Sequence, residues 1–402
     1  MNHKNLRLRI ESVTIDCVCA SRSGNQEVCL FPRSLSFPSC RLLPVLMLGI
    51  SLLALAPASR AETWTVALDG TGDFTDLQEA IDAAGSGDTI RVGPGIHEGP
   101  FWIETKSLVL RSIDGPAATI LQGIPAPDRD SREPVVHFFY EEQGGSEISG
   151  FTIRDGESGI KCSSASPWIH DNVIVHNRGP IGSGVCCVFW SDAVIESNWI
   201  VGNRAIYNCC FPSRGGGIYA DDSSPVVIRD NVVAFNQCRG QCLGGGISIH
   251  IGTVERNTVV GNDADGPAGG IELIGDELAV RANIVVGNRS HEFADGIMVQ
   301  RDPVIECNDI WGNGSENYWG AGPGDGDFSE DPLLCGIPAT EELSLEDPEA
   351  GVFALDAASP CLPGQHPDGA DCGRIGARET GCGERRITAV PAPERAETAL
   401  LV

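Results

Sequence analysis

Four residues of different chemistry, Tyr219, Asp221, His250 and Glu272, occupy related places in successive copies of an internal repeat. If each copy forms one coil of a stacked fold, Asp221 and His250 are direct neighbours on adjacent coils. A carboxylate beside an imidazole orients the ring and raises its basicity, as a general base requires. Tyr219 and Glu272 flank this pair, so the four are candidate catalytic residues. The alternative is a solvated sheet face, because outward strand positions are usually polar.

Five arginines near the same strands are candidate ligand-binding residues. A guanidinium pairs bidentately with a carboxylate, so they would suit an acidic ligand. The alternative is that they are loop residues that offset the charge of an acidic protein. They are Arg178, Arg204, Arg214, Arg239 and Arg289.

The elements that position these residues come from the repeat itself, Asn-x-(Ile/Val)-x-x-Asn. Its copies begin at Asn172, Asn198, Asn231, Asn257, Asn283 and Asn308, in steps of 26, 33, 26, 26 and 25 residues. Such regularity indicates a solenoid. A chain that turns sharply favours a left-handed residue at the bend, and Asn tolerates that conformation best after Gly. We therefore expect the asparagines to form two hydrogen-bonded ladders along the stack.

Each copy contains three short apolar segments and no helical pattern, for example 217–220, 225–228 and 232–235. Three strands per coil predict an all-β, right-handed parallel β-helix over residues 62–313. A leucine-rich repeat would instead show Leu at fixed offsets and one strand per unit. The columns expected to face inward are Ile169, Ile195, Ile228, Val254, Val280 and Ile305, and Ile174, Ile200, Val233, Val259, Val285 and Ile310.

One strand of each coil carries the candidate site, and its alternate residues should point outward. The two expected outward columns are Lys161, Cys186, Tyr219, Ser248, Glu272 and Met298, and Ser163, Val188, Asp221, His250, Ile274 and Gln300.

Both ends of the solenoid need a cover. At the N-terminal end, Thr75 to Gln78 predicts a capping box for a short helix that ends at Gly85 and buries Leu77, Ala80, Ile81 and Ala84. Residues 314–382 are rich in Gly, Pro and Cys and predict a C-terminal cap, and residues 383–402 predict a disordered tail.

Residues 1–61 predict a signal peptide with an over-extended start. An apolar run over 42–56 follows Arg33 and Arg41, and Ser59-Arg60-Ala61 is a small-x-small cleavage site before Glu62. The alternative is an uncleaved membrane anchor. We therefore expect a secreted or cell-surface protein, extracellular or periplasmic.

Twelve cysteines (16 minus 4) follow the signal segment, and in an exported chain they predict disulfides. Adjacent pairs do not suit zinc, although Cys238 and Cys242 could form half of a zinc site. We expect Cys209 or Cys210 to pair with Cys238 or Cys242, while Cys162 and Cys187 are either bonded or buried thiols. The expected staples of the cap are Cys335, Cys361, Cys372 and Cys382.

The full chain has a net charge of −27, and residues 62–402 carry 21 Lys+Arg (28 minus 7) against 52 Asp+Glu (55 minus 3). This balance argues against nucleic acid or anionic lipid as a partner. We expect a monomer with no cofactor. The acidic segment 325–331 could bind Ca²⁺, but it lacks the full EF-hand spacing, and a turn-rich loop is the alternative.

The repeats over residues 62–313 resemble the right-handed β-helix, pectin-lyase-like superfamily. The opening 66–81, with 90–98, is similar to the N-terminus of pectin methylesterases. However, the chain lacks their Gln-Asp-Thr-Leu, Asp-Phe-Ile-Phe-Gly and Arg-Pro-Trp motifs, and also the Asp-Pro-His-Glu of the bacterial epimerases. The overall likeness is to exported bacterial β-helix repeat proteins.

This resemblance implies a protein that binds an extracellular polysaccharide and modifies it as a lyase or epimerase. The four candidate catalytic residues would then abstract a sugar-ring proton, and the arginines would pair with uronate carboxylates. The alternative is a non-catalytic cell-surface or structural protein in which the solenoid is a rigid spacer.

Overall fold

The computed structural model describes residues 61–124, 133–140, 144–206, 213–336 and 353–382, together with two short strands near the N-terminus. The chain divides into two units, Met1–Ala58 and Ser59–Val402. The described part of the first unit is an antiparallel pair, β1 (Arg9–Ile10) and β2 (Val13–Thr14). The expected signal-peptide core and the expected C-terminal tail lie outside the described residues. Among the described residues, no helix has the length and apolar character needed to span a membrane.

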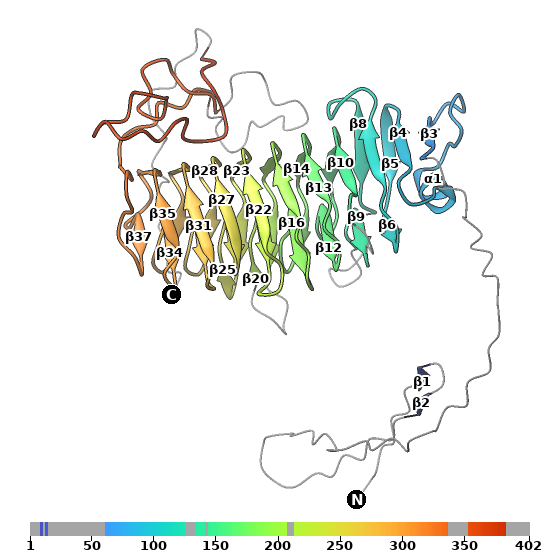
Figure 1. The fold of residues 1–402 in the computed structure, drawn as a ribbon, viewed down its shortest axis with the longest axis horizontal. Coiled ribbons are helices and arrows are strands. Elements are labelled where there is room, and N and C mark those ends of the chain that lie inside the picture. The colour runs from blue at the N-terminus through green and yellow to red at the C-terminus, as the bar shows by residue number, and fades with distance from the viewer. Residues whose placement is uncertain are drawn as a thin grey trace, which may run out of the picture. The chain divides into compact units, whose positions relative to one another are not determined.

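The second unit is a parallel β-helix whose coils stack along one axis (Figure 1). The first sheet has ten strands: β3 (Thr63–Val66), β4 (Thr89–Val92), β7 (Val109–Ser112), β10 (Glu147–Ser149), β13 (Trp168–His170), β17 (Val194–Glu196), β22 (Val226–Arg229), β27 (Gly252–Glu255), β31 (Leu278–Arg281) and β35 (Val304–Glu306). The second sheet has nine strands: β5 (Gly95–Glu98), β8 (Thr119–Gln122), β11 (Thr152–Arg154), β14 (Val173–Val175), β18 (Trp199–Val201), β23 (Val232–Ala234), β28 (Thr258–Val260), β32 (Ile284–Val286) and β36 (Asp309–Trp311). The third sheet also has nine: β6 (Phe101–Glu104), β9 (Val136–Phe139), β12 (Ile160–Ser163), β16 (Val185–Val188), β21 (Ile218–Ala220), β26 (Ile247–Ile249), β30 (Ile271–Leu273), β34 (Ile297–Val299) and β37 (Tyr318–Trp319). The predicted fold class is therefore confirmed.

The prediction of three strands per coil was incomplete. Five coils carry a fourth short strand directly after the second asparagine of the repeat, and these strands pair in parallel as a fourth sheet. A further parallel pair, β20 (Ser213–Arg214) and β25 (Cys242–Leu243), forms a separate two-stranded sheet. The strands of the fourth sheet are β15 (Arg178–Gly179), β19 (Arg204–Ile206), β24 (Gln237–Arg239), β29 (Asp263–Ala264) and β33 (Arg289–Ser290).

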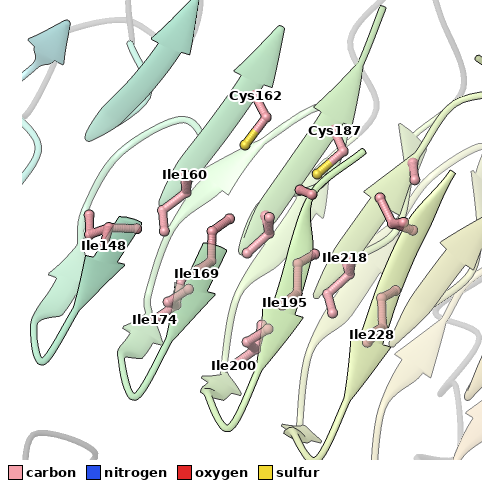
Figure 2. Close-up of a cluster of buried hydrophobic side chains, with 14 of the residues drawn as sticks. Ile148, Ile160, Cys162, Ile169, Ile174, Cys187, Ile195, Ile200, Ile218 and Ile228 are labelled. Carbon is pink, nitrogen blue, oxygen red and sulfur yellow. The ribbon is translucent and has the colours of Figure 1, made fainter. Parts of the chain in front are cut away.

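The interior of the coil is filled by the two predicted apolar columns. Eleven of their twelve residues have no solvent exposure, and only Ile305, at the C-terminal end, is exposed at all, at 8%. Figure 2 shows how the isoleucines of successive coils stack, with Cys162 beside Cys187 in the same interior column. Each fully buried side chain of this size contributes about 1.5–3 kcal/mol, so these columns supply much of the stability.

The asparagines form two continuous ladders, as predicted. Except on the last coil, the side-chain Nδ2 of each donates to Oδ1 of the asparagine on the next coil at 2.9–3.1 Å. The expectation that these residues are left-handed is wrong. The positive φ angles of the first ladder, +50° to +58°, belong to the residues immediately before each Asn, from Asp171 to Cys307. The bend one residue earlier lets each amide lie inside the turn and reach both neighbouring coils.

The predicted helix at the N-terminal end is α1 (Leu77–Ala83). Leu77, Ala80 and Ile81 are buried in the same cluster as the coil interior, so the helix covers the open core. Its N-cap is Asp76, whose side chain accepts from the backbone N–H of Glu79. The predicted capping box, which begins at Thr75, is therefore wrong.

The segment after the last coil packs along the side of the solenoid. Phe328, Phe353, Leu355, Ile375 and Ala377 form one buried cluster with the outer face of the second sheet. Figure 1 shows this segment in red beside the solenoid. The outer face of the second sheet is apolar because its outward column is largely Val and Ile, and this segment removes it from water.

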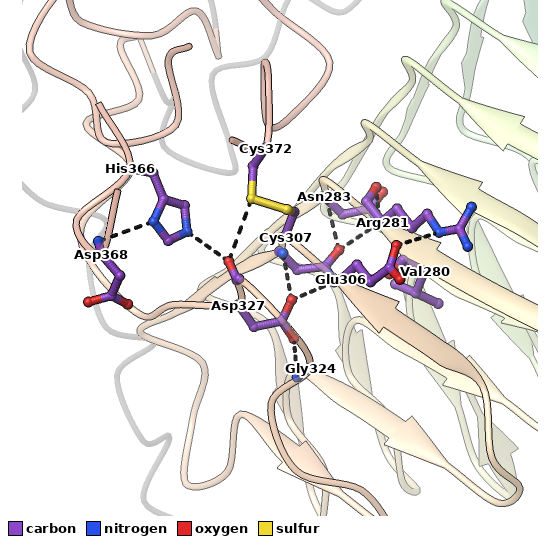
Figure 3. Close-up of a disulfide and its surroundings, with 12 residues drawn as sticks. Val280, Arg281, Asn283, Glu306, Cys307, Gly324, Asp327, His366, Asp368 and Cys372 are labelled. Atoms are coloured by element: carbon purple, nitrogen blue, oxygen red, sulfur yellow. Dashed lines mark hydrogen bonds and ion pairs between the residues drawn. A yellow bond between two sulfur atoms is a disulfide. The ribbon is translucent and has the colours of Figure 1, made fainter. Parts of the chain in front are cut away.

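Three of the four cysteines expected to staple the cap, Cys335, Cys372 and Cys382, form disulfides. Cys307 joins Cys372 and Cys335 joins Cys382, so the last coil is tied to the segment that covers it (Figure 3). Cys361 is a buried thiol that donates to Asp309 and was wrongly expected to be a staple.

A third disulfide joins Cys238 to Cys242 across a short turn, which contradicts the expected link of either one to Cys209 or Cys210. Cys209 and Cys210 themselves lie outside the described residues.

Candidate functional site

The candidate residues lie on the outer face of the third sheet, where strand pairing sets two columns of outward side chains. Both columns begin earlier than predicted, at Trp102 and Glu104 on β6. The first column reads Trp102, His137, Lys161, Cys186, Tyr219, Ser248, Glu272, Met298 and Trp319. The second begins Glu104, Phe139, Ser163 and Val188 and continues to Asp221 and His250.

Much of this face is covered, which contradicts the alternative of a solvated sheet face. Ser248 and Glu272 have no exposed surface, and Cys186 and Met298 are almost as buried. Glycine-rich segments pass directly over them: a Cβ added to Gly244 would lie 2.8 Å from the Cβ of Ser248. The covering follows from coil length, because the coil that precedes β16 has residues 176–184 between its second-sheet and third-sheet strands, whereas the coil that precedes β12 has only residues 155–159.

Asp221 and His250 do not form the predicted acid–imidazole pair. One carboxylate oxygen of Asp221 accepts from the backbone of Ser223 and from the hydroxyls of Ser223 and Ser224, and the other accepts from the backbone N–H of Phe189 at 2.8 Å. This carboxylate stabilises a turn. The pKa of His250 is lowered, because burial and the nearby Arg214 outweigh the attraction of Asp221 and Asp222. The expected increase in basicity is therefore wrong.

Tyr219, His250, Ser248, Glu272 and Arg214 are brought together, and we call them the Arg214–Glu272 cluster. The hydroxyl of Ser248 donates to Oε2 of Glu272 at 2.6 Å, and Nη1 of Arg214 lies 3.9 Å from the same oxygen. The rings of Tyr219 and His250 meet edge to face at 6.2 Å.

Burial sets the protonation of this cluster. It raises the pKa of Glu272, although the hydrogen bond from Ser248 and the charge of Arg214 act in the opposite direction. It also raises the pKa of Tyr219 to about 12. At neutral pH the phenol of Tyr219 is therefore protonated, and the imidazole of His250, with its lowered pKa, is neutral.

The other arginine candidates are separated along the fourth sheet. Arg178 and Arg204 are neighbours in register, and Arg289 is in register with Asp263. Arg239 is engaged by Asp263 at 2.6 Å and Asp265 at 2.9 Å. Only Arg214 joins the cluster.

The N-terminal half of the face carries aromatic rings that sequence reasoning missed. Trp102 and His137 have ring centroids 4.9 Å apart, His137 and Phe139 are 5.3 Å apart, and Phe139 and Tyr140 are 4.1 Å apart. We call these four residues the aromatic row. Extending the outward columns by two coils toward the N-terminus would have found three of the four.

Two more aromatic residues lie at the corresponding corner two coils further on, where the third sheet turns toward the first. Phe189 and Trp190 follow β16 as Tyr140 follows β9, and all three have a positive φ. Tyr140 is 55% exposed and Trp190 is 73% exposed. Large apolar side chains that remain in water at two corners along the same edge mark a contact surface.

His137 is the polar centre of the aromatic row. Its Nε2 lies 3.0 Å from the hydroxyl of Ser163. Burial and the nearby ammonium of Lys161 lower the pKa of His137 to about 4. The imidazole is therefore neutral at physiological pH and serves as a hydrogen-bonding aromatic ring.

The acidic segment after the last coil has a structural use. Asp327 accepts from the backbone and side chain of Asn308 through one oxygen, and from Tyr318 and Gly324 through the other, so it ends the first ladder. Figure 3 shows this carboxylate directed at the last coil. Within the described residues, no group of three or more His, Cys, Asp or Glu side chains is arranged to hold a metal ion.

A family comparison agrees with this architecture. The family model for the right handed beta helix region matches residues 137–289. Among solved structures, pectin methylesterase from carrot is similar at 13% sequence identity, over 67% of this chain and 88% of that chain, with a TM-score of 0.42. No curated protein sequence matches significantly. The parallel stack of coils and the family match together define a right-handed parallel β-helix protein.

Proposed function

We propose that this chain is an exported protein that binds an extracellular polysaccharide on the N-terminal half of the third sheet's outer face. The observation that carries the proposal is the aromatic row, which continues at the corner occupied by Phe189 and Trp190. Sugar rings present apolar C–H faces and polar edges, and aromatic side chains with polar neighbours match both.

The surroundings of the row supply the polar contacts. Lys161 and Ser163 extend from β12 beside His137 and Phe139, and Glu104 lies next to Phe139 on the other side. Successive coils repeat every ~4.8 Å, so a polymer lying along the axis meets similar groups at regular intervals. The disulfides of the described structure favour an exported protein.

The proposal is for binding and not for modification of the polymer. A lyase or epimerase needs a base in contact with the sugar ring. Of the predicted catalytic residues, Asp221 has both oxygens engaged in a turn, and Glu272 is fully covered. The aromatic row contains no carboxylate.

The test is a polysaccharide array, followed by affinity electrophoresis in gels that contain the best polymer. Tyr140→Ala with Trp190→Ala should weaken binding roughly tenfold, because each lost stacking contact is worth about 0.5–1.5 kcal/mol. The matched control is Trp168→Ala, which removes an exposed tryptophan from the first sheet.

If the control weakens binding as much as the double variant does, the polysaccharide does not bind on the outer face of the third sheet. If no polysaccharide binds, the proposal fails, and the solenoid acts as a rigid spacer.

A further inference from the structure

The outer face of the first sheet remains exposed over six consecutive strands, β13 to β35, which follow one another along the solenoid (Figure 1). The C-terminal segment packs on the outer face of the second sheet, and glycine-rich backbone covers much of the third. On the first sheet, by contrast, every outward residue of these six strands keeps contact with solvent. We call these outward residues the first-sheet strip.

One column of the first-sheet strip alternates between basic and acidic side chains. In register along the sheet it reads His170, Glu196, Arg229, Glu255, Arg281 and Glu306. Within one molecule, Arg229 pairs with Glu196 at 2.9 Å and Arg281 pairs with Glu306 at 3.0 Å. All four side chains stay partly exposed, so each can also contact a charge on another molecule.

The other column of the strip is mostly apolar. It reads Trp168, Val194, Val227, Thr253, Ala279 and Val304. Its two ends are its most exposed members, since Trp168 and Val304 are each 43% exposed.

Trp168 is held in a fixed position on this face. Its ring stacks on the ring of His170, with centroids 3.8 Å apart, and its indole N–H donates to Glu196 at 3.1 Å. A rigid, exposed tryptophan loses little conformational entropy on binding, and tryptophan is frequent among the residues that dominate protein interfaces.

The order of the charges makes the strip complementary to its own reverse. Consider a second copy that lies face to face with the first, related by a two-fold axis parallel to the strands and between β22 and β27. Such an axis reverses the order of the coils and preserves the position along each strand. Arg229 then faces Glu255 of the second copy, and Glu196 faces Arg281 of the second copy. Every acid in this column meets a base.

The same axis matches the apolar column. Trp168 of each copy faces Val304 of the other, so the two most exposed apolar residues of the column cover each other. The middle of the column brings Val227 against Thr253 of the second copy, and small side chains there allow the two sheets to approach closely.

Other two-fold arrangements of this face are unfavourable. An axis that passes through β27 would oppose Arg229 to Arg281 and Glu196 to Glu306, and like charges at an interface are costly. An axis parallel to the solenoid would oppose the charged column of one copy to the apolar column of the other. The axis between β22 and β27 satisfies both columns and engages all six strands.

We infer that the first-sheet strip binds a second copy of this chain in reversed orientation and forms a symmetric dimer. This differs from the monomer expected from the sequence. Six coils at ~4.8 Å span only about 25 Å, which is short for a protein interface, so the dimer should be weak, with a dissociation constant of about 10–100 µM. The inference does not depend on polysaccharide binding, because that binding is proposed for the third sheet.

Analytical ultracentrifugation of the full wild-type chain tests the dimer without any substitution. We expect a monomer at about 1 µM and mostly dimer at about 500 µM, as mass action requires for this affinity. A chain that is still monomeric at the higher concentration overturns the inference. The polysaccharide assay at about 1 µM involves the monomer, so the failure of one proposal can be told from the failure of the other.

Exchange of charges tests the register. Arg229→Glu and Glu255→Arg each place like charges opposite one another, so each variant alone should dimerise at least about tenfold more weakly than the wild type. In a mixture of the two variants, acid faces base again at both positions. We therefore expect a heterodimer whose affinity is within about threefold of the wild type.

The matched control is Arg91→Glu, which makes the same change at an exposed position of β4, on the same face but outside the strip. It should dimerise as the wild type does. Undiminished dimerisation of Arg229→Glu, or a mixture that stays monomeric, overturns the register.

Trp168→Ala tests the contact without changing any charge. It should weaken the dimer about tenfold, because it removes the exposed anchor that covers Val304 of the second copy. Unchanged dimerisation of this variant overturns the contact, whether or not the charge variants fold.

Discussion

Arg374 donates a hydrogen bond of 2.6 Å to Asp230, although 144 residues separate the two in sequence. Arg256 donates two more hydrogen bonds to the same carboxylate, at 3.0 and 2.9 Å. Asp230 is also the residue with a positive φ that precedes a ladder asparagine. One side chain therefore connects the bend of a central coil to the C-terminal segment that covers the second sheet.

Replacing Arg374 with Ala should lower the free energy of unfolding by about 1–2 kcal/mol, because hydrogen bonds between partly buried charged groups are stronger than surface pairs. Chemical denaturation measures the loss. Arg281→Ala is the control, since its ion pair with Glu306 is nearly half exposed on both sides and should contribute less than about 1 kcal/mol. Equal effects of the two changes would contradict a special stabilising role for the hydrogen bond from Arg374 to Asp230.

Asn236→Ala should be among the most damaging substitutions in the solenoid. The side chain donates to the carbonyl of Ile200 and to Asn262, and it accepts from the backbone and side chain of Asn203. Its removal leaves several buried groups unpaired, at a cost of about 3 kcal/mol or more. Thermal unfolding of this variant can be compared with that of Gln300→Ala, at an exposed position after β34. A similar melting temperature for both would show that the ladder adds little.

Asp309 should make the protein less stable as the pH rises. Burial raises its pKa from 3.8 to about 7, so the folded state holds a proton that the unfolded state has lost. This contribution is fully present below the unfolded pKa and is lost as the pH rises through 7, at roughly 4 kcal/mol in total. Denaturation of wild type and Asp309→Asn at pH 5 and pH 8 isolates the effect. An unchanged pH dependence in Asp309→Asn would refute this assignment.

His137 should act in the opposite direction. Its pKa is lowered from 6.5 to about 4, so below pH 6.5 the unfolded state binds a proton that the folded state excludes. Stability should therefore fall as the pH drops from 6.5 toward 4, by up to about 3 kcal/mol. His137→Gln should remove this part of the acid sensitivity in the same denaturation experiment. A variant that is equally sensitive to acid would show that His137 is protonated in the folded state.

The fold was predictable because a single constraint, the repeat, fixes it many times over. Ile169 and Ile174 identify two inward columns from spacing alone, and the ladder asparagines mark the same two corners of each coil. The fourth strand was missed because Arg178-Gly179 has no strand-like composition. It pairs only because the coils above and below it hold it in place.

The site was predictable in position but not in environment. Strand alternation correctly placed Tyr219 and Glu272 in one outward column. It could not show that glycine-rich backbone covers that column, because the path of a segment between strands depends on packing. The hydrogen bonds that direct Asp221 away from His250 come from Ser223 and Ser224, which belong to a turn whose geometry only the folded chain defines.

The asparagine ladders fix the positions of the strands but not the number of residues in every coil. The long step from Asn198 to Asn231 leaves all three main sheets in register, because its extra residues fall between β19 and β21. The number of residues in a coil can therefore vary between β19 and β21, whereas it is fixed between the two ladder asparagines. A foreign loop inserted between Ile206 and Ser213 would leave the three sheets and β20 unaltered, so this position is suited to the grafting of new recognition surfaces.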